Sequence, residues 1–320
     1  MSIVRVAVGM CAVDLNPPPA YRAGDLARLP ATALRFVVTV VLLALFFGWV
    51  DLDAVRDALA HADSGWFMAA VAAYVVGQLA NGLAWRHLLA DSGIAVTLGE
   101  MIRHDLGSVF WSTVVPGGVA GEVVKGVRIA RAQGGGPTVA TAILAARLVG
   151  GGSAGVVGLV MLPWSLTVQG HAAAAVVVLG GTAGAGATGL YLLRRVPTLL
   201  SRWLPRGRFP SASALARAAI ATSVAHLSFA ATTAACFAAA GHPLGLADAT
   251  WVSVATSLAE IVPVSVGGFG VRELAMTLLG GQLVPPAAAA SAAILYSAAF
   301  FGVVLLGGAS ELARSAASRG

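Results

Sequence analysis

The hydrophobic positions of this chain fall into long runs that few polar residues interrupt. Six of these runs are long enough to cross the hydrocarbon core of a bilayer, which takes about 20 residues in a helix. They cover residues 34–50, 66–89, 139–162, 172–193, 214–240 and 287–308. The pattern therefore predicts six full transmembrane helices.

Two further apolar segments are each interrupted by a glycine-rich break. The first covers 104–115 and breaks at Pro116-Gly117-Gly118, and the second covers 249–262 and breaks between Pro263 and Gly268. Both segments then resume with charged residues, which are Glu122, Lys125, Arg128 and Arg131 in the first and Arg272 and Glu273 in the second. Each segment therefore predicts half a span, a break and a second half.

The charges between the runs predict which side of the membrane each loop faces. Six arginines and no acidic residue lie between 194 and 217, whereas 51–63 holds four aspartates and one arginine. Because cytoplasmic loops are enriched in Lys and Arg, we place 194–217 and the basic residues 125–131 inside and 51–63 outside. Both termini are then cytoplasmic, and the chain is a multi-pass protein of the plasma membrane.

Threaded in this way, each half of the chain reads as span, span, re-entrant hairpin, span. Pro116 and Pro263 are 147 positions apart, and an odd number of crossings per half inverts the second half relative to the first. The sequence thus predicts an all-α polytopic membrane protein with an inverted repeat, a layout found in secondary transporters. The alternative is that both broken segments cross fully, which gives eight spans and parallel halves.

This threading divides the chain into one transmembrane domain and two tails. The domain covers 34–310 and consists of the repeats 34–165 and 172–310. The tails, 1–33 and 311–320, are expected in the cytosol.

Composition supports a membrane protein and excludes several other classes. The chain of 320 residues is 58% hydrophobic and 11% charged, with a mean hydropathy of +0.85, whereas about 25% charged residues is usual for soluble domains. The net charge of +6 comes mostly from arginines between apolar runs, so it indicates topology rather than nucleic-acid binding. The six histidines are scattered, and we expect neither a metal site nor another cofactor.

The breaks predict a binding site, because irregular backbone at membrane depth survives only where protein or water surrounds it. A half-helix that begins at a break points free N–H groups into the membrane, and such a helix start can hold a phosphate. The glycines of the two breaks are candidate residues for this site: Gly117, Gly118, Gly267 and Gly268.

Charged residues at depth extend this candidate site. Arg147 lies near the middle of its run, where an unpaired arginine costs at least about 3 kcal/mol, so it requires a partner such as Glu122 or a lipid phosphate. Glu122 lies three residues from Lys125 and could pair with it instead. Lys125 and Arg128 belong to the same set of candidates.

The second break carries an equivalent set of charges. Arg272 and Glu273 are adjacent and cannot face the same way on a helix, so at least one of them should point into the site or toward Glu260.

Three motifs together resemble the membrane domain of the lysylphosphatidylglycerol synthase/flippase family over about residues 34–308. They are Pro116-Gly117-Gly118 with Gly121-Glu122 and Arg128, Ala146-Arg147-Leu148-Val149-Gly150, and Pro263-x-Ser265-x-Gly267-Gly268-Phe269-Gly270-Val271-Arg272-Glu273. The resemblance implies a polytopic domain that moves or handles lipids. The chain lacks the soluble aminoacyltransferase domain of full-length members, so we do not expect it to make lysylphosphatidylglycerol.

Three classes of function follow. A lipid translocase would hold a phosphate head group with Arg147 and Arg272. A membrane-embedded transferase acting on a lipid-linked substrate would use Glu122, Glu260 or Glu273 as acid or base, and a non-catalytic accessory subunit would need none of them. We favour the translocase, with a membrane phospholipid or an isoprenoid-linked lipid as its ligand. Further copies of the chain or a separate lipid-synthesising enzyme are candidate protein partners.

Overall fold

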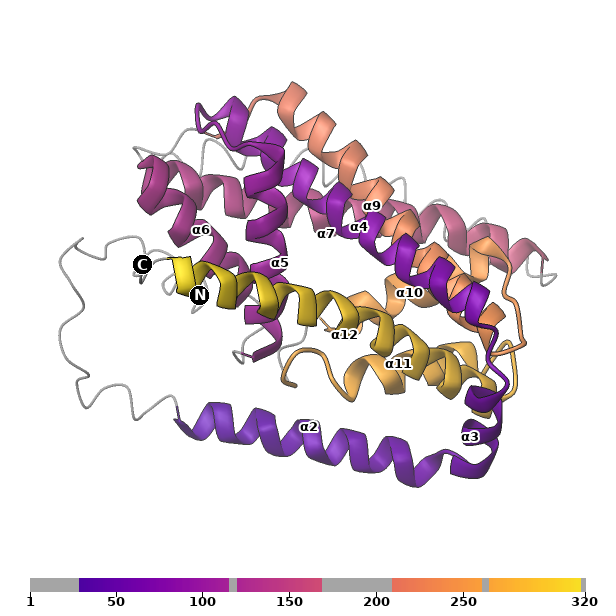
Figure 1. Ribbon diagram of the computed structural model, residues 1–320. Coiled ribbons are helices and arrows are strands. Elements are labelled where there is room, and N and C mark those ends of the chain that lie inside the picture. Colours follow the sequence, from indigo (N-terminus) through magenta and orange to yellow (C-terminus); the bar gives the residue numbers. More distant parts are fainter. Residues whose placement is uncertain (1–28, 115–119, 169–208, 261–264, 318–320) are drawn as a thin grey trace.

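Every secondary-structure element of the described residues is a helix. The computed structural model describes residues 29–114, 120–168, 209–260 and 265–317 (Figure 1). In chain order the helices are α2 (Leu29–Trp49), α3 (Leu52–Ala60), α4 (Ser64–Asp91), α5 (Leu98–Val114), α6 (Ala120–Gln133), α7 (Gly136–Val168), α9 (Ala212–Ala239), α10 (Leu246–Glu260), α11 (Val271–Gly280) and α12 (Pro286–Ala317). The predicted all-α class is confirmed.

Five of the six predicted spans correspond to helices of the structure. In the described part of the chain, α4, α7, α9 and α12 are long and apolar enough to cross a membrane, and the bent pair α2 and α3 would make a fifth span. The predicted span 172–193 lies outside the described residues. Length and apolar character of these helices identify an integral membrane protein.

Polar residues at the loops fix where these helices begin. Asp63 caps α4 through the amide of Trp66, and Ser211 caps α9 through the amide of Ala214. At the start of α5, the side chain of Glu100 accepts hydrogen bonds from the backbone N–H and hydroxyl of Thr97, which lower the pKa of Glu100. This is a capping box, in which cap and carboxylate satisfy each other's free groups.

The acidic stretch that the sequence places outside the membrane forms a short helix. Asp51 accepts hydrogen bonds from the amides of Asp53 and Ala54, and this cap starts α3. The chain bends by 85° between α2 and α3. Val55 is the buried residue of α3, and it packs in one cluster with Phe46 and Ala290.

Helices α4 and α9 form the centre of the bundle and run antiparallel. The amide of Asp63 at the start of α4 donates to the carbonyl of Ala239 at the end of α9. At the opposite end, the amide and hydroxyl of Ser211 donate to the carboxylate of Asp91 over 2.7 and 2.6 Å. Small residues let membrane helices approach closely.

The remaining helices pack around this pair in matched sets. Helix α5 contacts α12, and in the same way α10 contacts α7. Helix α4 contacts α5, α7 and α12, and its counterpart α9 contacts α10, α12 and α7. Helix α2 packs mainly on α11 and runs along the edge of the bundle (Figure 1).

The two helices of each broken segment are in contact with each other. Lys125 of α6 lies opposite Asp105 of α5, and Gly121 lies against Ser108, so the two helices run antiparallel. A Cβ atom at Gly121 would lie 1.9 Å from the Ser108 carbonyl oxygen, which explains the glycine. Helices α10 and α11 likewise meet through Glu260 and Arg272. The residues of the breaks themselves, 115–119 and 261–264, lie outside the described part.

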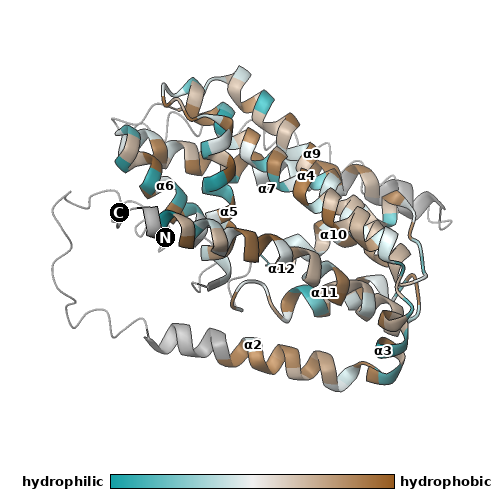
Figure 2. Cartoon of the chain, in the orientation of Figure 1, coloured by the Kyte–Doolittle hydropathy of each residue, from teal (hydrophilic) through white to brown (hydrophobic). Residues whose placement is uncertain are grey.

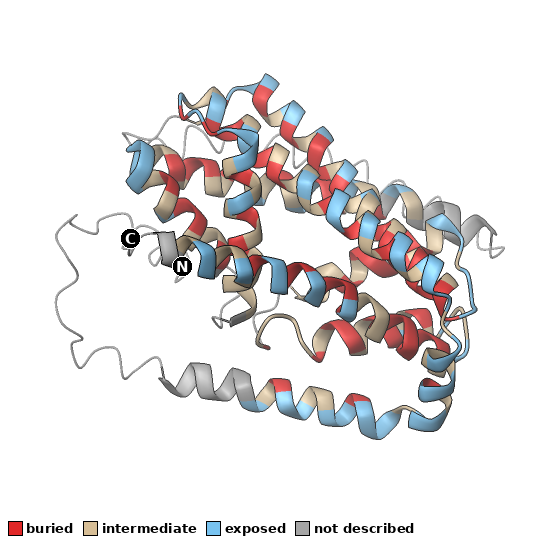
Figure 3. Cartoon of the chain, viewed as in Figure 1, coloured by how far each residue is buried: buried red, intermediate tan, exposed pale blue. Residues whose placement is uncertain are grey.

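The outward faces of the long helices are apolar. Figures 2 and 3 show α2 as largely hydrophobic and largely exposed, while polar positions concentrate on α3, α6 and the adjoining end of α5. Exposed large hydrophobic residues of these faces include Val40, Leu45, Val76, Ile220 and Leu305. Such surfaces suit contact with lipid chains rather than water.

Candidate functional site

The end of the second break is a glycine turn held against two other parts of the bundle. Gly267, Gly268 and Gly270 have φ angles of 61°, 80° and 80°, a region that suits glycine. The amide of Val266 donates to the Thr39 hydroxyl of α2 over 2.8 Å. A Cβ atom at Gly267 would lie 3.3 Å from the Thr113 Cα near the end of α5. The turn therefore brings the edges of both breaks together.

Arg272 lies directly after this turn and is buried. Arg272 is 6% exposed. Its Nε donates to Glu260 Oε1 over 2.6 Å, and its Nη2 donates to the Gly267 carbonyl over 3.3 Å. The Phe300 ring lies 4.3 Å from the guanidinium carbon. A side chain at Gly268 would meet Glu260 Oε1 at 2.8 Å, so this glycine leaves room for the ion pair. Of the two adjacent residues Arg272 and Glu273, Arg272 is the one that points toward Glu260.

One nitrogen of this guanidinium lacks a hydrogen-bond partner in the part of the chain that the structure describes. Arg272 Nη1 is buried and makes no hydrogen bond to the described residues. Buried polar groups are nearly always hydrogen-bonded, and an unpaired one costs about 1 to 3 kcal/mol. The free N–H groups are therefore available to a ligand oxygen.

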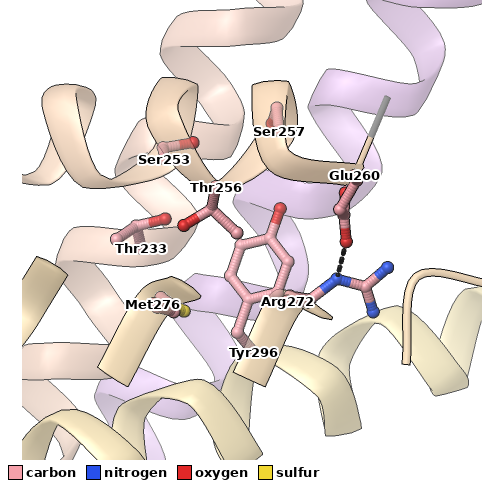
Figure 4. Close-up of a pocket in the computed structure, with 8 residues that line it drawn as sticks. All are labelled: Thr233, Ser253, Thr256, Ser257, Glu260, Arg272, Met276 and Tyr296. Atoms are coloured by element: carbon pink, nitrogen blue, oxygen red, sulfur yellow. Dashed lines mark hydrogen bonds and ion pairs between the residues drawn. The ribbon is translucent and has the colours of Figure 1, made fainter. Parts of the chain in front are cut away.

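A small polar cavity adjoins Arg272 (Figure 4). Its volume of about 10 Å³ holds roughly one water molecule. Besides Glu260, Arg272 and Met276, its lining consists of hydroxyl-bearing residues, namely Thr233, Ser253, Thr256, Ser257 and Tyr296. The chemistry of the wall suits an oxyanion, but the cavity must widen before a phosphate can enter.

Glu273 has a different role from its neighbour. Its carboxylate accepts the backbone N–H of Gly270 over 2.7 Å and the hydroxyl of Ser297 on α12. The carboxylate thus already occupies the start of α11 where we expected a phosphate. The candidate group for an anion at this break is therefore Arg272 rather than the start of α11.

The resumed half of the first broken segment holds a second buried cation. Lys125 is 3% exposed, its Nζ lies 2.7 Å from Asp105 Oδ1 and 3.7 Å from the centre of the Trp85 ring. The alternative pairing of Lys125 with Glu122 is wrong, because Asp105 faces Lys125 across the hairpin. Lys125 and Arg272 are 147 positions apart, the same step as between Pro116 and Pro263.

Arg147 has the partner that the sequence suggested. Its Nε lies 2.7 Å from Glu122 Oε2, which links α7 to α6. The Arg147 side chain is 42% exposed, so this pair is more accessible than the other two.

Arg128 joins α6 to the end of α12. Its Nη1 and Nη2 donate to the two oxygens of Glu311 over 2.7 and 2.5 Å, and Trp111 Nε1 donates to the same carboxylate over 3.0 Å. With the pairs of Lys125 and Arg147, three ion pairs fasten α6 to α5, α7 and α12.

The candidate residues therefore form two groups rather than one. Glu260, Gly267, Gly268, Arg272 and Glu273 gather at the second break, whereas Glu122, Lys125, Arg128 and Arg147 lie on and around α6. Gly117 and Gly118 lie outside the described residues.

Sequence reasoning missed several partners, above all Asp105, Glu311 and Tyr296. Asp105 and Glu311 are 20 and 183 positions from the cations that they pair with, so local spacing gives no signal for them. In the described part of the chain, no three His, Cys, Asp or Glu side chains gather closely enough to hold a metal ion.

A known family model covers most of the chain. Residues 32–308 match the family model described as "Lysylphosphatidylglycerol synthase TM region", which agrees with the extent of the resemblance found from the motifs. No curated protein matches the chain.

Proposed function

The chain belongs to the lysylphosphatidylglycerol synthase TM region family, and we propose that it translocates a phosphate-bearing membrane lipid. Membership links the chain to membrane phospholipids. The cargo of the proposed translocase is a phospholipid or an isoprenoid-linked lipid, whose head group enters the protein while its acyl chains stay in the bilayer.

One observation carries this proposal: a buried arginine at the end of a membrane break with an unpaired nitrogen. Arg272 Nη1 lies buried without a hydrogen-bond partner among the described residues, beside hydroxyl groups that line a cavity. Guanidinium groups bind phosphate oxygens in pairs. Because the cavity holds only about one water molecule, the structure corresponds to a closed state in this proposal.

We further propose that the two halves, 34–165 and 172–310, form an inverted repeat with re-entrant hairpins. The matched contacts around α4 and α9, the antiparallel course of these two helices and the 147-residue step between Lys125 and Arg272 support this layout. The antiparallel packing of α5 on α6 supports re-entry over a full crossing. With the arginine bias of the loops, both termini lie in the cytosol and the first hairpin opens to that side.

Translocation has more support than chemical transfer. Each glutamate that could serve as acid or base is engaged: Glu122 with Arg147, Glu260 with Arg272, and Glu273 with Gly270 and Ser297. These carboxylates position cations and backbone, which suits a binding site better than a reaction centre.

The test is lipid translocation by the purified protein in phosphatidylcholine vesicles. The vesicles carry a trace of fluorescent phosphatidylglycerol or a fluorescent isoprenoid phosphate, and a membrane-impermeant reductant bleaches the outer leaflet. Wild-type protein should expose the inner-leaflet probe, and Arg272→Gln should reduce this rate to that of protein-free vesicles.

Arg131→Gln is the matched control, because Arg131 is exposed on the same helix as Lys125 and lies outside both groups of candidate residues. It should transport like the wild type. Folded Arg272→Gln that transports both probes at the wild-type rate, or a wild type that transports neither, would disprove the proposal.

A further inference from the structure

A second cavity lies on the outer surface of the central helix pair, away from Arg272. It has a volume of about 260 Å³ and lies between α4 and α9. Its lining includes Ala80, Leu83 and His87 of α4, and Arg217, Ile220 and Val224 of α9. We call this cavity the α4–α9 groove.

The groove combines an apolar floor with a cationic end. Ile220 is 68% exposed and Val224 is exposed as well, so this face of the span looks onto the bilayer. Arg217 is exposed and has no ion pair or hydrogen bond to the described residues. Asp91, the acid one turn beyond His87, is held by Ser211.

The cationic end lies at the depth of lipid head groups. His87 is four residues from the end of α4, and Arg217 is six residues from the cap of α9. At a rise of about 1.5 Å per residue, these distances are about 6 and 9 Å along the helices. Arginine stems extend toward the interface while their charge stays in the head-group layer.

The repeat does not account for the charge of Arg217 or for the imidazole of His87. The positions 147 residues from Arg217 and His87 are Ala70 and Ala234. The other end of the same helix pair therefore lacks a matching basic pair at these positions, which restricts the feature to one leaflet.

We infer that the α4–α9 groove binds one anionic phospholipid of the leaflet that contains Arg217. Its phosphate lies against Arg217 and His87, and part of one acyl chain fills the apolar floor between Leu83, Ile220 and Val224. A soluble protein partner would not reach this floor, because it lies on the membrane face of two spans. The site is independent of the proposed transport through the Arg272 site.

The test uses phosphatidylglycerol with a photoactivatable diazirine on its acyl chain, incorporated as a trace into phosphatidylcholine vesicles that hold the full-length protein. After illumination, peptide mass spectrometry should find the label on α9 around Ile220 to Val224. Excess unlabelled phosphatidylglycerol should remove this label, and the same excess of phosphatidylcholine should not.

Two variants separate the head-group and acyl-chain parts of the site. Arg217→Gln should lower labelling of α9 about fivefold, the change expected for one basic residue near an anionic lipid surface. Ala80→Phe should lower it as well, because the added ring fills the floor while Arg217 and His87 remain. Arg131→Gln, which removes an exposed cation from another helix, should leave the labelling unchanged.

The labelling results test the α4–α9 groove independently of the transport assay. Loss of the α9 label in both groove variants, with transport measured independently, supports the site. Unchanged labelling in both variants, equal competition by phosphatidylcholine, or the same loss in Arg131→Gln would overturn it. Failure of Arg272→Gln to affect transport would contradict the proposed function but not this site.

Discussion

The pair of Glu260 and Arg272 allows its structural role to be separated from its proposed role in binding cargo. Glu260→Gln leaves the Arg272 charge buried with a weak hydrogen bond of 3.3 Å to Gly267 and the Phe300 ring. Breaking a buried pair from one side costs about 3 to 5 kcal/mol. The Glu260 side chain is 26% exposed, so the pair is only partly removed from solvent and the cost lies at or below the lower end of this range. We therefore expect a loss of about 2 to 3 kcal/mol.

Removing both charges should restore stability without restoring transport. The double variant Glu260→Gln with Arg272→Met contains no unpaired buried charge, and such replacements of ion pairs by neutral side chains are often neutral or stabilising. Its stability should come within about 1 kcal/mol of the wild type. In our proposal it still fails to translocate the probe, because the phosphate has lost its guanidinium.

Thermal unfolding in detergent at a fixed scan rate measures the first effect. For a chain of this size, 1 kcal/mol corresponds to about 2 to 4 °C, so Glu260→Gln should melt roughly 4 to 12 °C below the wild type. Asp105→Asn and the double variant Asp105→Asn with Lys125→Met are the matched controls for stability, because they break and then remove the buried ion pair of the first broken segment. A double variant that transports at the wild-type rate would refute the assigned role of Arg272, and one less stable than Glu260→Gln would refute the ion-pair reasoning.

Three further predictions concern packing and topology. Gly121→Ala should destabilise the protein by about 1 to 3 kcal/mol, because its Cβ would lie 1.9 Å from the Ser108 carbonyl oxygen, whereas Gly151→Ala, with nothing within 4 Å, should be neutral or stabilising in thermal unfolding. Arg128→Gln should make the end of α12 more sensitive to proteolysis than Arg131→Gln does, since of these two arginines only Arg128 pairs with Glu311; equal cleavage would contradict this. In a Cys11→Ser background, an impermeant maleimide should label Asp57→Cys from outside intact cells, and Gly99→Cys and Gln133→Cys only after permeabilisation. Opposite accessibility of residues 99 and 133 would instead support the eight-span alternative.

Hydropathy alone predicts the helices well because a membrane span must satisfy its backbone internally. The limits of α4 and α9 lie within a few residues of the predicted runs, whereas α12 continues nine residues beyond the end of its run. The helix α3 was not predicted, since its nine residues are too few to appear as a span and its start depends on the side chain of Asp51.

An ion pair could be predicted from the sequence only where the cost of an unpaired charge, or the adjacency of charged residues, limited the possible partners. Arg147 lies too deep to stay unpaired, and Glu122 was the nearest acid on a resumed helix, so that pair could be inferred from the sequence. The pairing of Lys125 with Asp105 depends on the register with which α6 folds back on α5. The close contact of Gly121 with Ser108 sets this register. The spacing of the charged residues along the sequence does not reveal it.

The two buried cations also indicate why only one hairpin would bind cargo. Lys125 and Arg272 occupy corresponding positions, and each faces a carboxylate from the first half of its own broken segment. Lys125 meets Asp105 and the face of Trp85, whereas Arg272 Nη1 has no partner among the residues described and lies beside a hydroxyl-lined cavity. The compact ammonium group of a lysine can be satisfied by one carboxylate and an aromatic ring. The planar guanidinium of an arginine has more N–H donors, so some of them remain for a ligand. If both hairpins derive from one repeat, the first has become a structural clamp fastened by three ion pairs, and the second has retained the capacity to bind an anion.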